Sequence, residues 1–198
     1  MVRLVRALVM AAALVAAPAA AQVFGSDGEA FVSAMREGEF SKALELIEKP
    51  GSTVANYRGG DGDAGLHIAV RRRNANWVGF LLARDADPNL GNSAGDTPLI
   101  LAARLGFSEG VARMLMSGAS VDVDNKLGET ALIAAVQQRQ TGIVRMLLEA
   151  GANPDKTDFA SGYSAREYAK RDSRSTEIVR LMDTVKAKKT ATVGPVRP

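Results

Sequence analysis

The stretch Gly95-Asp96-Thr97-Pro98-Leu99, followed by Ala102-Ala103, decides the fold because it returns along the chain at a fixed interval. It comes back as Gly128-Glu129-Thr130-Ala131-Leu132, and a degenerate form begins at Gly62, so the opening glycines at positions 62, 95 and 128 are evenly spaced. A repeat of this length predicts a solenoid of helix pairs, in which each unit packs mainly on its neighbours. Solenoids bind other macromolecules far more often than they catalyse reactions.

The residues of one block predict two short helices joined by a turn. Thr97 is a good N-cap, and Pro98 suits the first turn of a helix, where its missing N–H costs nothing. The first helix should end near Gly106, and apolar residues at helical spacing over 111–115 predict a second one. Gly118 then provides the left-handed position that commonly ends a helix.

Five blocks follow this template, and the first and last of them are degenerate. The last block opens one residue late, which places an insertion among residues 158–161, at a predicted hairpin tip. The five blocks span residues 31–47, 62–89, 95–122, 128–155 and 162–182.

The recurring pattern Gly-x-Thr-Pro-Leu-x-x-Ala-Ala, with a later Leu-Leu-x-x-Gly-Ala-Asp-x-Asn, resembles the ankyrin repeat over residues 30–185. The resemblance implies an all-α ankyrin-repeat solenoid of about five helix-turn-helix repeats with hairpin loops. The chain departs from the family pattern at Arg73, Arg139 and Asp85, which replace helix-ending glycines, so the local turn geometry there is open. The residues expected to be structural are His67, Thr97, Pro98, Leu99, Thr130 and Leu132.

The N-terminus has the pattern of a cleaved signal peptide over residues 1–21. Arg3 and Arg6 precede an apolar run, and Ala19-Ala20-Ala21 fits the small-residue rule for cleavage. An uncleaved anchor is the alternative, but the run is too short to span a hydrocarbon core of about 30 Å. Because the signal looks bacterial, we expect an exported periplasmic protein, with secretion into the medium as the alternative. Residues 22–29 are expected to be a linker, and 186–198 a flexible basic tail.

The charge balance argues against nucleic acid as a partner. The chain has 25 basic and 22 acidic residues, but two of the arginines leave with the predicted signal and four cations belong to the tail. The body therefore has 19 basic residues against 22 acidic ones, so the basic character lies at the ends. Cysteine is absent, which excludes disulfides and thiolate metal sites.

No motif for catalysis, metal or cofactor binding stands out, so we expect no catalytic residues, no metal and no cofactor. His67 is the only histidine, and no nucleophile is placed beside it in a motif; the resemblance implies a hydrogen-bonding strut between loops. Asp61-Gly62-Asp63 and Asp122-Val123-Asp124 invite a calcium interpretation. Their next ligand positions, however, are Gly65 and Lys126, so the spacing fails and turn-forming aspartates are favoured.

What remains is a surface for a protein partner. In the resembling family, contacts come from the hairpin tips and from the exposed side of the first helices, which line a concave groove. Carried over by position, the tip residues after the glycine include Asp96 and Glu129, and the residues after the paired alanines include an arginine row. The candidate set is Arg36, Arg71, Arg72, Arg104, Leu105, Gln137, Gln138, Asp96, Glu129, Lys126, Leu127 and Phe159, with Arg171 in the last block.

Two interpretations of this surface stay open. An arginine row suits binding, since guanidinium groups pair with carboxylates and stack on aromatic rings. Alternatively, the arginines are solvated and pair with the acidic tips, where each exposed pair contributes about 0–1 kcal/mol. We expect a monomeric, non-enzymatic module that binds a protein partner of unknown identity, without nucleic acid or stable membrane insertion. A secreted effector or toxin-neutralising protein is the alternative.

Overall fold

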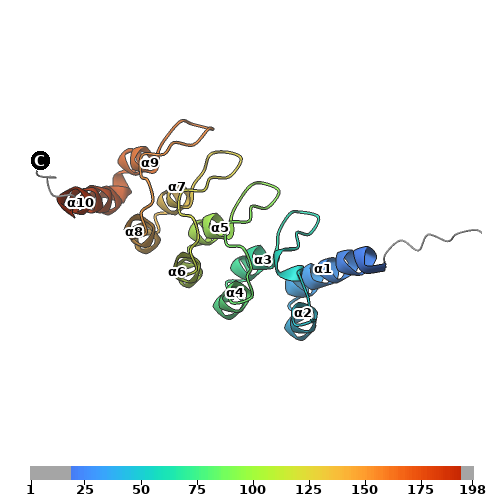
Figure 1. Cartoon of the computed structure of the whole chain (residues 1–198). Helices are drawn as coiled ribbons and strands as arrows, with labels where there is room; N and C mark the ends of the chain where they lie inside the picture. Colours follow the sequence, from blue (N-terminus) through green and yellow to red (C-terminus); the bar gives the residue numbers. More distant parts are fainter. Residues whose placement is uncertain (1–18, 193–198) are drawn as a thin grey trace, which may run out of the picture.

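The computed structural model describes the backbone of residues 19–192 and the side chains of residues 27–184. Within this range the chain forms ten α-helices, arranged as five successive pairs (Figure 1), and no β-strand. The predicted all-α solenoid of helix-turn-helix repeats is therefore confirmed. The helices are α1 (Ala19–Glu37), α2 (Phe40–Ile47), α3 (Gly65–Arg71), α4 (Ala75–Leu82), α5 (Pro98–Leu105), α6 (Ser108–Met116), α7 (Ala131–Gln137), α8 (Thr141–Glu149), α9 (Ala165–Arg171) and α10 (Thr176–Thr192).

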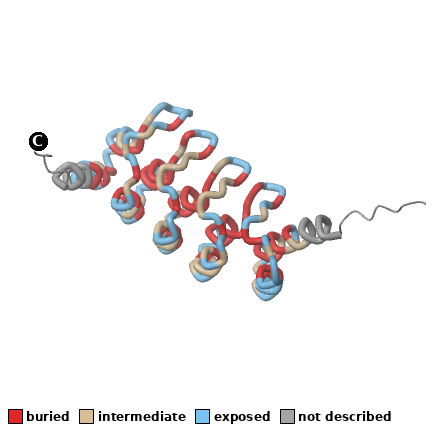
Figure 2. Tube along the Cα trace, in the orientation of Figure 1, coloured by how far each residue is buried: buried red, intermediate tan, exposed pale blue. Residues whose placement is uncertain are grey.

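The helices form two layers, and hairpins project from one of them (Figure 1). The odd-numbered helices, here the inner helices, pack on one another along the stack, as do the outer helices α4, α6, α8 and α10. The core lies between the layers, where Leu99, Met114, Leu132 and Leu147 are fully buried (Figure 2). Because each repeat buries its apolar face against its neighbours, stability is shared along the stack.

The Thr-Pro start of the repeat forms a helix cap. The Oγ1 of Thr97 accepts a hydrogen bond from the N–H of Ile100 (3.3 Å), and Pro98 occupies the first helical turn of α5. Gly106 then ends α5 with a φ of 68°. Thr130 caps α7 in the same way.

The three residues that stand where the family pattern has glycine adopt the backbone geometry of a glycine turn. Arg73, Asp85 and Arg139 have φ values of 51°, 58° and 53°, in the left-handed region. A residue with a Cβ pays a conformational cost there that glycine avoids. The fold is thus kept at these turns in spite of the residue that occupies them.

Four hairpins connect the repeats, and each is closed by a backbone hydrogen bond. The first three close from Gly59 to Asp63, Asn92 to Asp96, and Asn125 to Glu129, each over the same length. The fourth closes from Asp158 to Tyr163 and is one residue longer. The extra residue of the last repeat therefore lies in a hairpin, where a solenoid tolerates it.

The N-terminal boundary differs from the expected linker, because residues 22–29 lie within α1. The buried face of α1 includes Phe31 and Met35, and Gly28 continues it one turn earlier by lying against the ring of Tyr57. At the other end α10 continues to Thr192, into the segment expected to be a tail. Residues 1–18 and 193–198, with most of the predicted signal and the end of the tail, lie outside the described residues.

Candidate protein-binding surface

The hairpin tips are joined to one another along the stack by backbone hydrogen bonds. In each case an N–H at one tip donates to a carbonyl at the preceding tip. The bonds run from Ser93 to Asp61 (3.3 Å), from Lys126 to Ala94 (3.1 Å) and from Phe159 to Leu127 (2.8 Å).

Beneath the tips, buried asparagines connect successive repeats. The Nδ2 of Asn92 donates to Asp63 (2.8 Å), and the Nδ2 of Asn125 donates to Asp96 (2.7 Å). Asp63 and Asp96 are only 3% and 6% exposed. The expected placement of Asp96 at an exposed tip is therefore wrong: it lies at the base of its hairpin because its carboxylate bonds the next repeat.

The arginines that follow these aspartates are paired with them. Arg71 donates to Asp63 (2.7 Å), and Arg104 donates to Asp96 (2.8 Å) and also to Glu129 of the following repeat. Burial alone would raise the pKa of Asp63 and of Asp96, but hydrogen bonds from arginine and asparagine outweigh it and lower both. The hydrogen bond to Asp96 is also the main cause that raises the pKa of Arg104. Of the two interpretations, the structure favours arginines that hold their own hairpins.

The N-terminal part of the arginine row, Arg36, Arg71 and Arg72, lines one hollow of about 320 Å³, which Arg104 does not line. Arg36 forms an ion pair with Asp61. The guanidinium of Arg72 donates to the carbonyl of Arg36 (2.8 Å) and lies 5.6 Å from the ring centre of Phe40, so it turns toward the outer helix α2. Leu105, a member of the candidate set, is partly buried against the core.

The pattern of pairing changes in the fourth and fifth repeats. Gln137 occupies the position in the fourth repeat that Arg104 holds in the third, so Glu129 lacks an arginine from its own repeat. Gln137 and Gln138 are exposed at the end of α7. Asp158 occupies the position equivalent to Asn125 and has no amide to donate. Instead it accepts hydrogen bonds from the N–H groups of Ser161 and Gly162 and from the hydroxyl of Tyr168.

These contacts close the last hairpin on itself. Burial would raise the pKa of Asp158, but the hydrogen bonds from Tyr168 and Ser161 lower it, and the bond to Asp158 raises the pKa of Tyr168. The side-chain ladder of asparagines thus stops between the third and fourth hairpins, and the backbone bond from Phe159 to Leu127 continues across this step.

Two large apolar side chains stand exposed on these last tips. Leu127 is 62% exposed and Phe159 is 72% exposed. Phe159 lies close over Gly128, where a Cβ would come within 2.7 Å of the Phe159 nitrogen, so a side chain at 128 would push the tips apart. We call Lys126, Leu127 and Phe159 the tip patch.

Beside the inner helices α7 and α9 lies a hollow of about 330 Å³, lined by Gln137, Tyr168 and Arg171 among others. The guanidinium of Arg171 lies 4.5 Å from the ring centre of Tyr163. Its contact is therefore with an aromatic face, whereas Arg71 and Arg104 contact carboxylates.

His67 is fully buried and connects two hairpins. Its Nδ1 accepts from the N–H of Ala64 (3.2 Å), and its Nε2 donates to the carbonyl of Asp96 (2.9 Å). Burial lowers the pKa of its ring. Ala64 occupies the cap position that threonine fills in the next two repeats and has no side-chain oxygen to accept the N–H of residue 67. The His67 ring makes a different contact, because it accepts from the N–H of Ala64 itself.

The described residues contain no group of three or more acidic or histidine side chains that could hold a metal ion. In the same range, no helix is both long enough and apolar enough to cross a bilayer.

An aromatic cluster lies on the outer helices and was not expected from the repeat pattern. Phe40 stacks on Trp77 at 5.2 Å between ring centres, and Trp77 meets Phe80 edge-on at 4.8 Å. The available signal was helix α4 itself, which contains no charged residue.

In a comparison with known families, residues 66–158 match the model for ankyrin repeats, in three copies. Comparison with curated proteins gave no match. Ankyrin repeats are generally modules for protein–protein interaction, and proteins that contain them are typically not enzymes. Residues 66–158 therefore contain ankyrin repeats, set within a solenoid of five helix pairs.

Proposed function

We propose that this chain is a non-enzymatic module that holds a protein partner in the periplasm, through its last hairpin tips and the concave side of the adjoining inner helices. The observation that carries the proposal is the pair of exposed apolar side chains, Leu127 and Phe159, on neighbouring tips. Contiguous exposed apolar groups rimmed by polar ones mark interaction sites, and Lys126 provides such a polar neighbour.

The paired arginines shift the proposed centre of binding toward the C-terminal repeats. Arg71 and Arg104 already bond carboxylates at short distance, so a partner would have to displace those contacts. Gln137, Gln138 and Arg171 do not carry that cost, and they lie at the C-terminal ends of α7 and α9, in the two repeats whose hairpins bear the tip patch. A standard interface requires about 800 Å² from each partner, which tips and inner helices together can supply.

The periplasmic address rests on the N-terminal sequence. Arg3, Arg6, the apolar run and Ala19-Ala20-Ala21 support export and cleavage after residue 21. Mass spectrometry of the chain recovered from cell fractions tests this proposal. A chain starting at Gln22 in the periplasm supports it, a cleaved chain in the medium favours the secreted effector, and an uncleaved chain contradicts both.

Affinity capture with cross-linking from an envelope fraction tests partner binding. The bait is the mature chain, compared with a variant carrying Leu127→Lys and Phe159→Lys and with the charge-matched control Glu149→Lys, an exposed position on the outer helix α8. We expect one partner that is captured by the wild type and the control and lost with the tip variant. A partner retained by the tip variant would refute the tip patch as the binding site.

A further inference from the structure

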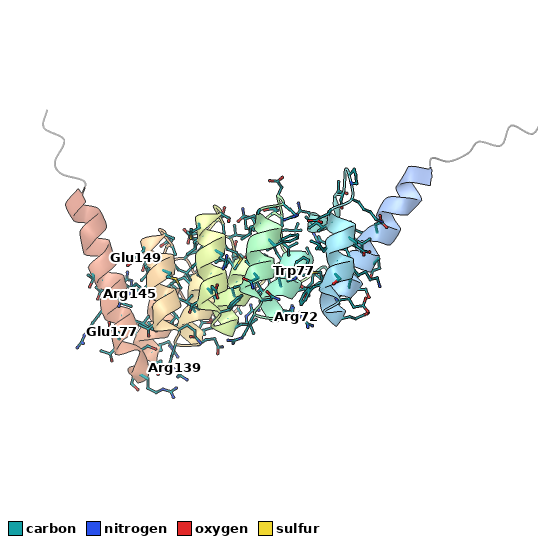
Figure 3. The ribbon with its side chains drawn as sticks, turned by 90° about the horizontal axis from the view of Figure 1, so that it is seen from below. Arg72, Trp77, Arg139, Arg145, Glu149 and Glu177 are labelled. Atoms are coloured by element: carbon teal, nitrogen blue, oxygen red, sulfur yellow. The ribbon has the colours of Figure 1, made fainter. Side chains whose placement is uncertain are left out.

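The outer helices carry a second surface, unrelated to the hairpin tips. A groove of about 360 Å³ runs between α2 and α4, and Trp77 projects on this side of the molecule (Figure 3). Its lining residues are Phe40, Ser41, Leu44, Asn76, Trp77 and Phe80.

The walls of this groove are apolar and open to solvent. The stacked Phe40 and Trp77 rings and the edge-on Phe80 form a continuous aromatic face, and Leu44 is 37% exposed at its side. A second groove, of about 500 Å³, lies on the other side of α4, against α6. Gly79 lines it from α4, and Met116, which is 88% exposed, lines it from α6, together with the ion-paired Glu109 and Arg113.

The charges around the first groove are unevenly distributed. Arg72 and Arg73 lie in the turn between α3 and α4 and donate to the backbone carbonyls of Arg36 and Leu105, so Arg72 faces the first groove and Arg73 faces the following repeat. Within the described part of the chain, neither guanidinium is bonded to a carboxylate. At the far end of α4, Arg84 is neutralised by Glu48 (2.8 Å). The end of the first groove near Arg72 therefore carries a positive charge, whereas the positive charge at the end near Arg84 is neutralised.

The same side of the C-terminal repeats has a different character. There the outer helices present charged side chains, including Arg145 and Glu149 on α8 and Glu177 on α10 (Figure 3). Among the described residues of the outer helices, the exposed large apolar side chains are Leu44 on α2 and Met116 on α6, on either side of the aromatic residues of α4. An exposed apolar surface of this kind indicates an interaction site.

The contacts of the aromatic rings exclude a cationic ligand. The guanidinium of Arg84 lies 3.5 Å from the ring centre of Phe80, and that of Arg72 lies over Phe40. Two ring faces are therefore already occupied by cations, which would repel a third. A suitable occupant combines apolar side chains with carboxylates near Arg72 and Arg73.

The spacing of the two grooves fits a helix better than an extended segment. Packed helices lie about 8–10 Å apart, so grooves on either side of α4 are separated by a similar distance. On an α-helix, residues i and i+7 are on one face and about 10.5 Å apart. An amphipathic helix lying across α2, α4 and α6 can therefore place one apolar side chain in each groove.

We propose that the two grooves flanking α4 dock an acidic amphipathic helix of a partner protein. The site is separate from the tip patch, so it would give the solenoid a second binding face beyond the proposed function. The chain's own residues 1–18 match the charge poorly, because their charged residues are Arg3 and Arg6.

The test uses a random library of 16-residue helical peptides, selected on the purified mature chain. Trp77 is the only tryptophan, so its fluorescence reports directly on the occupation of the first groove when a selected tryptophan-free peptide is titrated. We expect enriched peptides with apolar residues at i and i+7, a net negative charge, and binding that shifts the Trp77 emission.

Three variants with a native circular dichroism spectrum locate the binding. Leu44→Lys should weaken binding of the selected peptides at least about tenfold, and Phe159→Lys should leave it unchanged. The double variant Arg72→Glu and Arg73→Glu should weaken binding of the acidic peptides and strengthen that of versions with lysine in place of glutamate.

Several results would overturn the proposal. These are enrichment of basic peptides, peptides that bind Leu44→Lys as well as the wild type, and loss of binding with Phe159→Lys. Concentration-dependent self-association that Leu44→Lys abolishes would also overturn it, because a second copy would then cover the grooves. Leu44→Lys leaves the tip patch unchanged, so a negative result in the peptide experiment does not contradict the proposed function. A result that refutes the tip patch as a binding site would likewise not affect the peptide experiment.

Discussion

The fourth hairpin is held in place by different contacts from those that hold the second and third hairpins. Residues 92–96 and 125–129 are tied to the preceding repeat by a buried asparagine that donates to an aspartate. Residues 158–163 have Asp158 at the equivalent place, and its hydrogen bonds stay within the last repeat. The polar side-chain ladder thus covers the N-terminal part of the stack and ends before its last hairpin.

The exposed tips differ in parallel with this change. The earlier tips carry small or polar residues, Asp61, Ser93 and Ala94, whereas the later ones carry Leu127 and Phe159. In the earlier hairpins the charged and amide side chains are hydrogen-bonded within the fold, so few of them are left to bind a partner. Where the ladder ends, apolar groups stand free, which is why we place the binding site there.

The largest expected effect comes from comparing a core leucine with a nearby tip leucine. Leu132→Ala removes a fully buried side chain of α7, so it should lower the free energy of unfolding by about 2–5 kcal/mol. Leu127→Ala, at the exposed tip, should change it by less than about 0.5 kcal/mol. Urea unfolding measures both, and equal losses would mean that the tip is part of the core.

The ladder itself can be broken by Asn125→Asp. This change removes the amide that donates to Asp96 and places a carboxylate beside Asp96 and Glu129, so we expect a loss of about 1–3 kcal/mol. Asp158→Asn is the matched change in the hairpin that closes on itself, and it should cost less than Asn125→Asp, because its amide oxygen can still accept from the N–H groups of Ser161 and Gly162. Similar losses from the two variants would contradict the distinction between the hairpins.

Acid should destabilise the ladder in two steps. His67 has a lowered pKa in the fold, so the unfolded chain takes up its proton first and stability declines as the pH falls below 6.5. Asp63 and Asp96 also have lowered pKa values, and their contribution is lost as the pH falls below 3.8.

Melting temperatures measured between pH 8 and pH 3 check this expectation. The variant Ala64→Thr with His67→Ile, which copies the threonine and isoleucine of the next two repeats, should lose the first step and keep the second. A first step that persists in this variant would assign it to another group.

The smallest expected effect is at the left-handed turns. Asp85→Gly relieves a φ of 58° at an exposed position, so it should raise the free energy of unfolding by about 0.5–1 kcal/mol. Asp87→Gly, exposed nearby and outside the left-handed region, is the control and should not stabilise. A gain at Asp87 equal to that at Asp85 would show that the backbone angle is not the cause.

The repeat period and the caps were enough to predict the fold. Thr97, Pro98 and the glycines act locally, so their positions define where helices begin and end without knowledge of distant contacts. The exposure of Leu127 and Phe159 follows from the same register.

The site was harder to predict because its contacts cross repeats. Asp96 follows a glycine and looks like a tip residue, yet Asn125, from the next hairpin, draws it into the interior. The groove at Trp77 was missed because it forms between α4 and the degenerate first repeat, whose register the repeat pattern does not define.

Amide hydrogen exchange of the chain, with and without the captured partner, shows directly where the partner binds. We expect the partner to slow exchange in the hairpins 125–129 and 158–163 and at the exposed ends of α7 and α9, while residues 59–63 change little. Protection confined to residues 59–63 and the helices α1 and α3, with none at the last two hairpins, would contradict this expectation.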